Sequence, residues 1–152
     1  MIPIEQFKTV MDKTPLITID FICKDKSEKI LLGKRVNKPA HGYYFTPGGR
    51  IFKNESIENS IKRLSLKELG VELNLSDLKF NGIYEHIFDD SIFDDISTHC
   101  INIAFDYSFN KFDNLPKFEH ENYRMYSIEE IMNNDNIHGY VRDFFKKNKG
   151  II

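Results

Sequence analysis

The sequence contains no tryptophan and only two cysteines, Cys23 and Cys100, each inside an apolar run typical of a strand. Two such cysteines cannot build a disulfide framework, and neither has a partner at the spacing of a zinc site. No hydrophobic run is long enough to span a membrane, and the first ten residues lack the pattern of a signal peptide. We therefore expect a soluble, cytoplasmic chain with two buried free thiols.

An excess of charge of one sign is also lacking, since 21 Lys and Arg are matched by 23 Asp and Glu. This balance excludes a global field that would recruit nucleic acid or an anionic membrane. An anionic ligand must then be held by a few local cations, and a small molecule is the expected partner. The abundant residues are aromatic, 13 Phe and 7 Tyr, which suit the core of one mixed α/β domain over residues 1–152.

Alternating apolar residues and turn signals predict the elements. Strands are expected over 15–25, 30–36, 78–88 and 98–109, with shorter ones within 38–49 and at YRMY (123–126). Helices are expected from Glu55 to Leu69, capped by Asn54 and stopped by Gly70, after the Ser127–Glu130 capping box, and over about 139–148. The order ββ–α–ββ–β–α predicts an α/β (α+β) fold, a mixed sheet with helices on its faces.

One face of the first predicted helix combines apolar and acidic residues. At 100° per residue, Ile57, Ile61, Leu64 and Glu68 fall within about 60° of one another, which predicts three core contacts and one carboxylate among them. A buried carboxylate is costly unless it is paired or binds a cation. The alternative is that Glu68 reaches water in the last helical turn or pairs with Lys67 or Arg63.

The turn before this helix, Pro47-Gly48-Gly49-Arg50, allows close approach of the backbone to a ligand. Together with the helix it resembles the Nudix box, G-x5-E-x7-R-E-U-x-E-E-x-G-U, where U is a bulky aliphatic residue. The matching residues are Gly49, Glu55, Arg63, Glu68, Gly70 and Val71. Leu64 and Lys67 replace two glutamates, and Ser65 replaces an aliphatic residue. Of the three glutamates in the REUxEE part of the box only Glu68 is left, and one carboxylate cannot balance the several cations that Nudix hydrolases use to attack phosphorus.

These departures resemble one Nudix branch, the GDP-mannose mannosyl hydrolases (GDP-mannose glycohydrolases). The likeness covers nearly the whole chain, through TPLITIDFI, LLGKRVNKPAHGYYFTPGGRIFKNE, RLSLKELG, GIYEHIFDD, STH and FEHENYRMY. It implies a Nudix-type α/β/α sandwich with a mixed β-sheet, and a homodimer. It also implies that water displaces GDP from C1 of the sugar, with inversion and one Mg²⁺ per site.

The resemblance implies a metal site and a base. Glu68, the Gly48 carbonyl and Glu119 would hold the metal, and His120 would be the general base. Glu119 departs from the glutamine usual in this branch, and its added charge favours a hard cation, Mg²⁺ or, as a substitute, Mn²⁺. Taken alone, His120 in its polar segment is an ordinary exposed histidine.

The remaining implied site residues surround the substrate. Asp20 and Arg35 would assist catalysis at the sugar and the leaving group, while Phe7, Arg35, Arg50 and Arg63 would bind the nucleotide. Cys100 stands where the branch has a tyrosine near the leaving group. The alternatives are a structural role for Asp20, a solvated charge at Arg35 and a core position for Phe7.

Two other functions remain open from the sequence. The first is ordinary Nudix cleavage of a nucleoside diphosphate derivative at phosphorus, and the second is a catalytically silent module that binds nucleotide sugars. The sequence does not select among GDP-mannose, GDP-glucose and other GDP-sugars, since hydroxyl discrimination depends on side-chain placement.

Overall fold

The computed structural model describes all residues except 1, 113–114, 117–119 and 147–149. Its helices are α1 Ile4–Lys13, α2 Ile57–Leu69, α3 Ile128–Asn133 and α4 Gly139–Asp143, with a 3₁₀ turn η1 at Leu75–Asp77. Its strands are β1 Leu16–Lys24, β2 Ile30–Arg35, β3 Tyr44–Phe45, β4 Gly48–Arg50, β5 Lys79–Phe88, β6 Thr98–Ser108 and β7 His120–Tyr126.

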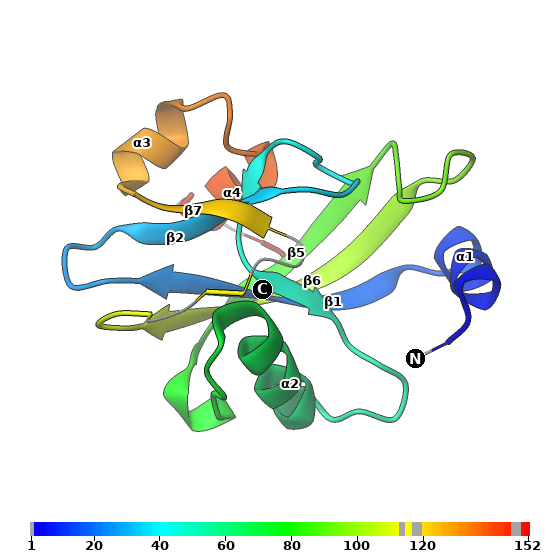
Figure 1. The fold of residues 1–152 in the computed structure, drawn as a ribbon, viewed down its shortest axis with the longest axis horizontal. Helices are drawn as coiled ribbons and strands as arrows, with labels where there is room; N and C mark the ends of the chain where they lie inside the picture. The colour runs from blue at the N-terminus through cyan, green and yellow to red at the C-terminus, as the bar shows by residue number, and fades with distance from the viewer. Residues whose placement is uncertain (1, 113–114, 117–119, 147–149) are drawn as a thin grey trace.

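One mixed sheet organises the molecule, in the order β3-β2-β1-β6-β5, with β4 paired to β1 and β7 to β2. The β1–β6 pair is parallel, whereas the other strand pairs are antiparallel. Helix α2 lies on one side of the sheet and α3 with α4 on the other (Figure 1). This arrangement confirms the predicted α/β (α+β) sandwich with a mixed sheet.

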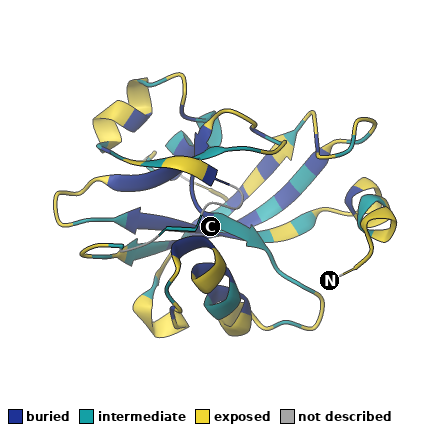
Figure 2. Cartoon of the chain, viewed as in Figure 1, coloured by how far each residue is buried: buried dark blue, intermediate teal, exposed yellow. Residues whose placement is uncertain are grey.

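The two faces of the sheet carry separate apolar cores. Under α2, Ile19 and Phe21 of β1 pack with Ile61 and Leu64 of the helix. On the other face, strands β2, β3 and β5 pack against α3 and α4, with Phe144 fully buried. Figure 2 shows the buried residues concentrated along the central strands, so the sheet is the rigid support of both layers.

Helix α2 differs from its prediction at its start. Ser56, not Asn54, is the N-cap, and its side chain accepts a hydrogen bond from the Asn59 amide. Asn54 instead adopts a left-handed backbone, with φ 65°. Ile57 is 43% exposed, so its predicted core contact is wrong, because the first turn extends past the apolar layer. The predicted stop is confirmed, since Gly70 has φ 73°.

Both ends of the chain also depart from the prediction. Residues Ile4–Lys13 form α1, which was not predicted, and α4 ends at Asp143, earlier than expected. Ile151 and Ile152 hydrogen-bond the backbone of Ile83 and so extend the sheet at its β5 edge. The capping box of Ser127 and Glu130 is confirmed at the start of α3.

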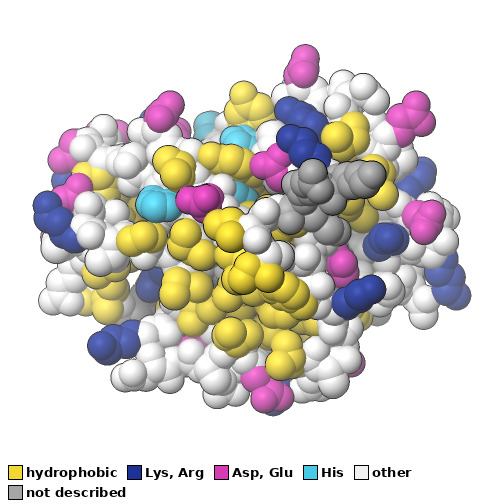
Figure 3. Space-filling model, turned by 180° about the vertical axis from the view of Figure 1, so that it is seen from behind, with side chains coloured by type: hydrophobic (Ala, Val, Ile, Leu, Met, Phe, Trp, Pro, Cys, Tyr) yellow, Lys and Arg dark blue, Asp and Glu magenta, His cyan; other side chains and the backbone are white. Residues whose placement is uncertain are grey.

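Apolar side chains gather on the rear of the molecule (Figure 3). Among the exposed apolar residues, Phe80 and Ile87 lie on the edge strand β5, and Ile151 and Ile152 lie beside it. Ile17 of β1 is also half exposed and pairs with Ile101 of β6. Among the described residues, no helix combines the length and apolar character needed to cross a bilayer.

Candidate functional site

A cavity of about 350 Å³ opens beside the β3–β4 segment and is bounded by α1, α2 and the central strands. Seven of the predicted site residues line it: Phe7, Asp20, Arg35, Gly48, Arg50, Arg63 and His120. They come from segments far apart in the sequence, so the fold assembles them. Glu68 lies behind this wall, and Glu119 falls outside the described residues.

Gly48 lets the backbone pass directly beside Asp20. The two residues are partners in the β1–β4 pairing. A Cβ atom at position 48 would collide with the Ile19 carbonyl and the Asp20 carboxylate. Only glycine therefore fits this position of β4, and Gly48 lines the cavity.

Glu68 and His120 meet at the back of the cavity. Glu68 is 2% exposed and His120 is 1% exposed, and Glu68 Oε2 lies 3.7 Å from His120 Nδ1. Neither imidazole nitrogen, nor Glu68 Oε1, has a hydrogen-bond partner among the described residues. Such groups are costly to bury, so this pair fits a site completed by a ligand, a water or a cation.

The backbone of β2 makes room for this histidine. His120 is the first residue of β7 and pairs with Arg35 of β2, so it is not the exposed loop residue that its polar segment suggested. A Cβ atom at Gly33 would lie 2.6 Å from the Cβ of His120. The glycine thus lets the imidazole reach the cavity wall.

Asp20 is held by a buried polar network that the sequence analysis missed. Thr46 donates a hydrogen bond of 2.7 Å to its carboxylate, and Asn102 bonds both Thr18 and Asp20. Burial raises the pKa of Asp20 to about 6, while these hydrogen bonds, Arg35 and His120 limit the rise. The network fixes the carboxylate's orientation toward the cavity.

Arg63 is anchored within the protein. It donates two hydrogen bonds to Glu55, of 2.7 and 2.8 Å, and one of 2.8 Å to the Arg50 carbonyl. Its guanidinium also lies 3.8 Å from the centre of the Phe52 ring. Arg63 therefore shapes the loop between β4 and α2, and its charge is largely compensated by Glu55.

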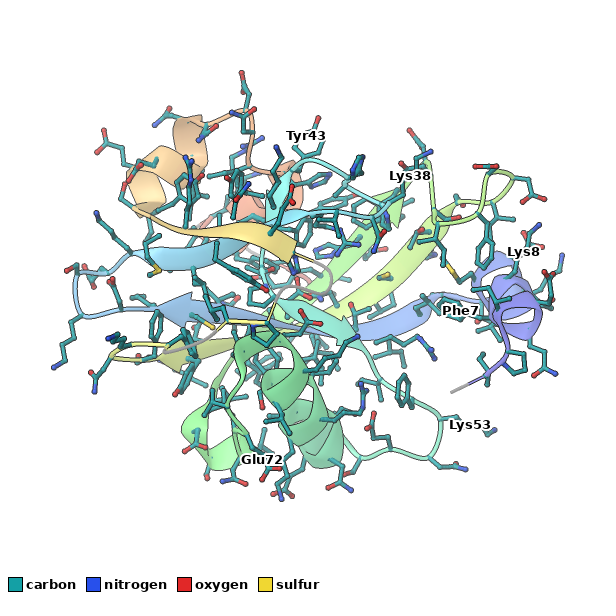
Figure 4. The ribbon with its side chains drawn as sticks, in the orientation of Figure 1. Phe7, Lys8, Lys38, Tyr43, Lys53 and Glu72 are labelled. Atoms are coloured by element: carbon teal, nitrogen blue, oxygen red, sulfur yellow. The ribbon has the colours of Figure 1, made fainter. Side chains whose placement is uncertain are left out.

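Arg50 lies between two aromatic rings. Its guanidinium is 4.4 Å from the centre of Phe7 and 4.8 Å from that of Phe52. Phe7 and Lys8 leave α1 on the side that faces the rest of the molecule (Figure 4), and Lys8 forms a 2.8 Å ion pair with Asp95. These contacts place α1 at the mouth of the cavity. Phe52 was not predicted, because aromatic residues in a loop carry no distinctive signal.

The charge of the cavity wall is positive. Its described lining includes four cationic side chains, Arg35, Arg50, Arg63 and Lys67, but one carboxylate, Asp20. Arg35 donates a 2.7 Å hydrogen bond to the Pro39 carbonyl, which fixes one edge of its guanidinium. Burial and the nearby Arg63 lower the pKa of Arg50. The wall is thus suited to an anion such as a diphosphate.

Another part of the cavity wall is aromatic and apolar. It is formed by Phe45, His86, Phe88 and Cys100. His86 is buried and stacks on Tyr140, with ring centres 4.6 Å apart. Burial lowers its pKa to about 4, with a further contribution from His138. A neutral imidazole and aromatic rings suit an uncharged portion of a ligand.

A divalent cation would find a partial ligand set here. The described residues contain no group of three or more His, Cys, Asp or Glu side chains able to hold one. Glu68 Oε1, which accepts no hydrogen bond among the described residues and lies 4.0 Å from the Lys67 ammonium, and the close backbone approach at Gly48 nevertheless fit a cation that also uses backbone oxygen. The predicted role of Glu119 lies outside the described residues.

The fold finds counterparts among known proteins. The MutT protein from Methanosarcina mazei Go1 superposes with a TM-score of 0.70 at 23% identity, covering 88% of this chain and 92% of that one. The NUDIX domain of Shewanella oneidensis NrtR, solved with ADP ribose, gives a TM-score of 0.60 at 16% identity, with 86% and 87% covered. Both likenesses concern the fold.

Sequence comparison is more specific. The low-salt glycan biosynthesis protein Agl8 of Haloferax volcanii is 34% identical over 115 residues, which are 75% of this chain and 71% of that protein. The model of the NUDIX domain matches residues 14–147, which include the whole predicted box. This chain therefore belongs to the Nudix family.

Proposed function

We propose that this Nudix protein hydrolyses GDP-mannose, or a related GDP-hexose, to GDP and the free sugar by attack of water at sugar C1. The observation that carries the proposal is His120, a buried imidazole on the wall of a cationic cavity, beside Glu68, the one glutamate that the REUxEE part of the box retains. The branch resemblance supports the substrate, as does the likeness to a protein named for glycan biosynthesis.

In this reaction the water oxygen forms a bond to C1 on the face opposite the leaving group, and the configuration inverts. His120 accepts the proton of the water, a role worth ~10²–10⁴-fold for a well-placed base. The C1–O bond breaks, and its electron pair stays on the diphosphate oxygen of GDP. Arg35 and Arg50 stabilise that charge, and the Asp20 carboxylate, ionised above a pH of about 6, stabilises positive charge at C1.

Nudix hydrolases generally use divalent cations such as Mg²⁺. When bound by Glu68, the Gly48 carbonyl and Glu119, Mg²⁺ would supply further neutralisation of the departing diphosphate. Mn²⁺ should substitute, since the proposed ligands are all oxygens.

Hydrolysis in ¹⁸O-labelled water tests the position of attack. Label in the released sugar supports attack at C1, whereas label in a phosphate product would overturn it in favour of cleavage at phosphorus. Binding of GDP-mannose without turnover in Mg²⁺ would instead favour a catalytically silent module. A screen of GDP-mannose, GDP-glucose and other nucleotide sugars, with both products identified, selects the sugar.

His120→Gln tests the base. The amide keeps much of the imidazole's size but cannot accept the proton, so we expect kcat to fall by ~10²-fold or more with a small change in KM. The rate should be measured in saturating Mg²⁺ at pH 7 to 9. A variant with the wild-type kcat would remove His120 from the base role.

We further propose that the protein is a homodimer, as the branch resemblance implies. The exposed apolar residues on the rear of the molecule support this, since large apolar patches mark association sites. Sedimentation equilibrium should give about twice the 17.9 kDa chain mass. A monomer at micromolar concentration would contradict the proposal.

A further inference from the structure

Lys67 occupies an unusual place in this cavity. It lies in the last turn of α2, where the Nudix box has a carboxylate, and its side chain is 45% exposed. Its ammonium is 4.0 Å from Glu68 Oε1, and the residue lines the same cavity as Arg50 and His120. A positive charge thus stands beside the carboxylate that the box retains.

Two of the arginines on the wall are held by their neighbours. Glu55 compensates the charge of Arg63, and Arg50 lies between the rings of Phe7 and Phe52. A lysine differs from both, because its flexible stem carries three rotatable donors that can follow a phosphate group. Lys67 is 45% exposed and lines the cavity, so its flexible stem can carry the ammonium toward a bound anion.

The same charge disfavours a cation at this position. Like charges repel at short range, and the repulsion is stronger at a protein surface than in bulk water because the effective dielectric constant is lower. A doubly charged ion beside Lys67 would be repelled more strongly. Lys67 and a second divalent cation are therefore alternatives at this side of the cavity.

We propose that Lys67 is a resident cation that binds the diphosphate of the nucleotide in the place of a second divalent cation. This inference rests on the proposed function only in that the ligand carries a diphosphate. It predicts that a diphosphate binds in the absence of metal, that Lys67 contributes to that binding, and that a carboxylate at position 67 increases metal binding.

Isothermal titration calorimetry with inorganic pyrophosphate, GDP and ADP, in EDTA and in Mg²⁺, tests the proposal. Lys67→Met keeps the length and helix propensity of the side chain but removes its charge. We expect pyrophosphate and GDP binding in EDTA to weaken about tenfold, the usual value of a charge-assisted contact. Lys62→Met is the matched control, since Lys62 lies on the same helix and pairs with Glu58 at 3.9 Å, and it should change affinity less than twofold.

Lys67→Glu gives a second readout that does not depend on activity. Electron paramagnetic resonance of free Mn²⁺ should show tighter or additional Mn²⁺ binding in this variant, because two carboxylates then adjoin. Wild-type affinity for pyrophosphate in Lys67→Met, or unchanged Mn²⁺ binding in Lys67→Glu, overturns the proposal. So does a wild-type protein that binds no diphosphate without metal. If pyrophosphate and ADP bind through Lys67 but GDP and GDP-mannose do not, the proposal stands and the GDP-hexose function fails.

Discussion

At the scale of the single residue, Gly33 controls the position of the proposed base. A Cβ atom there would lie 2.6 Å from the His120 Cβ and 2.9 Å from the Tyr123 ring. Both residues belong to β7, and the pairing of β7 with β2 leaves them little room to move away. We expect Gly33→Ala to displace His120, lower kcat at least tenfold and cost about 1–3 kcal/mol of stability through overpacking.

Steady-state kinetics and urea unfolding measure these two effects. Gly139→Ala is the control, because a methyl group there meets only the end of the Arg142 side chain, at 3.7 Å. It should leave kcat and stability near wild type. A Gly33→Ala variant as active as Gly139→Ala would show that the strand tolerates the methyl group and that Gly33 does not position the base.

At the scale of the element, Glu55 fastens the loop after β4 to helix α2. Its carboxylate accepts hydrogen bonds from Arg63, Ser60 and the Phe52 amide, and the Arg63 contact lowers its pKa to about 2. Glu55→Gln should therefore destabilise the fold by ~1–3 kcal/mol at pH 7, measured by urea unfolding. Glu58→Gln, which loses an exposed 3.9 Å pair with Lys62, should cost less than about 0.5 kcal/mol.

The contribution of Glu55 to the free energy of unfolding should depend on pH. Because the folded pKa of Glu55 is depressed, its contribution is present above the unfolded value of 4.5 and is lost as the pH falls toward 2. The difference between wild type and Glu55→Gln should shrink over that range. Equal destabilisation by the Glu55 and Glu58 variants would contradict a fastening role.

Local signals account for the elements that the sequence predicted well. Strand alternation identified β1, β5 and β6, and the capping box located α3, because these patterns depend on neighbouring residues. The cap of α2 was predicted at Asn54 and lies at Ser56, because Asn and Ser are both favourable capping residues and only the folded loop distinguishes them. The parallel pairing of β1 with β6 joins residues more than 80 positions apart, which no local pattern encodes.

The same contrast holds for the site. The predicted residues that line the cavity were found through motif positions, which fix spacing but not contacts. Thr46 was missed because its partner, Asp20, is 26 residues away. The compensation of Arg63 by Glu55 was also missed, since a motif does not state which of its charges face each other.

At the scale of the whole molecule, two buried groups give opposite pH dependences of stability. His86 has a folded pKa of about 4 against 6.5 when exposed, so its contribution is lost as the pH falls from 6.5 to 4. Asp20 has a folded pKa of about 6 against 3.8, so its contribution is present below 3.8 and is lost as the pH rises through 6. Each effect amounts to ~3 kcal/mol. In the window between pH 4 and 6 they nearly cancel in the wild type.

Replacing one group at a time should expose the slope of the other. In His86→Phe the free energy of unfolding should rise as the pH falls from 6 to 4, because Asp20 alone remains of the pair. In Asp20→Asn it should fall over the same interval, because His86 takes up a proton in the unfolded state but stays neutral in the folded state. Urea unfolding in EDTA at half-unit pH steps measures both slopes, and other titrating groups are common to all three proteins. Parallel curves for the wild type and both variants would contradict the buried, opposed ionisation of His86 and Asp20.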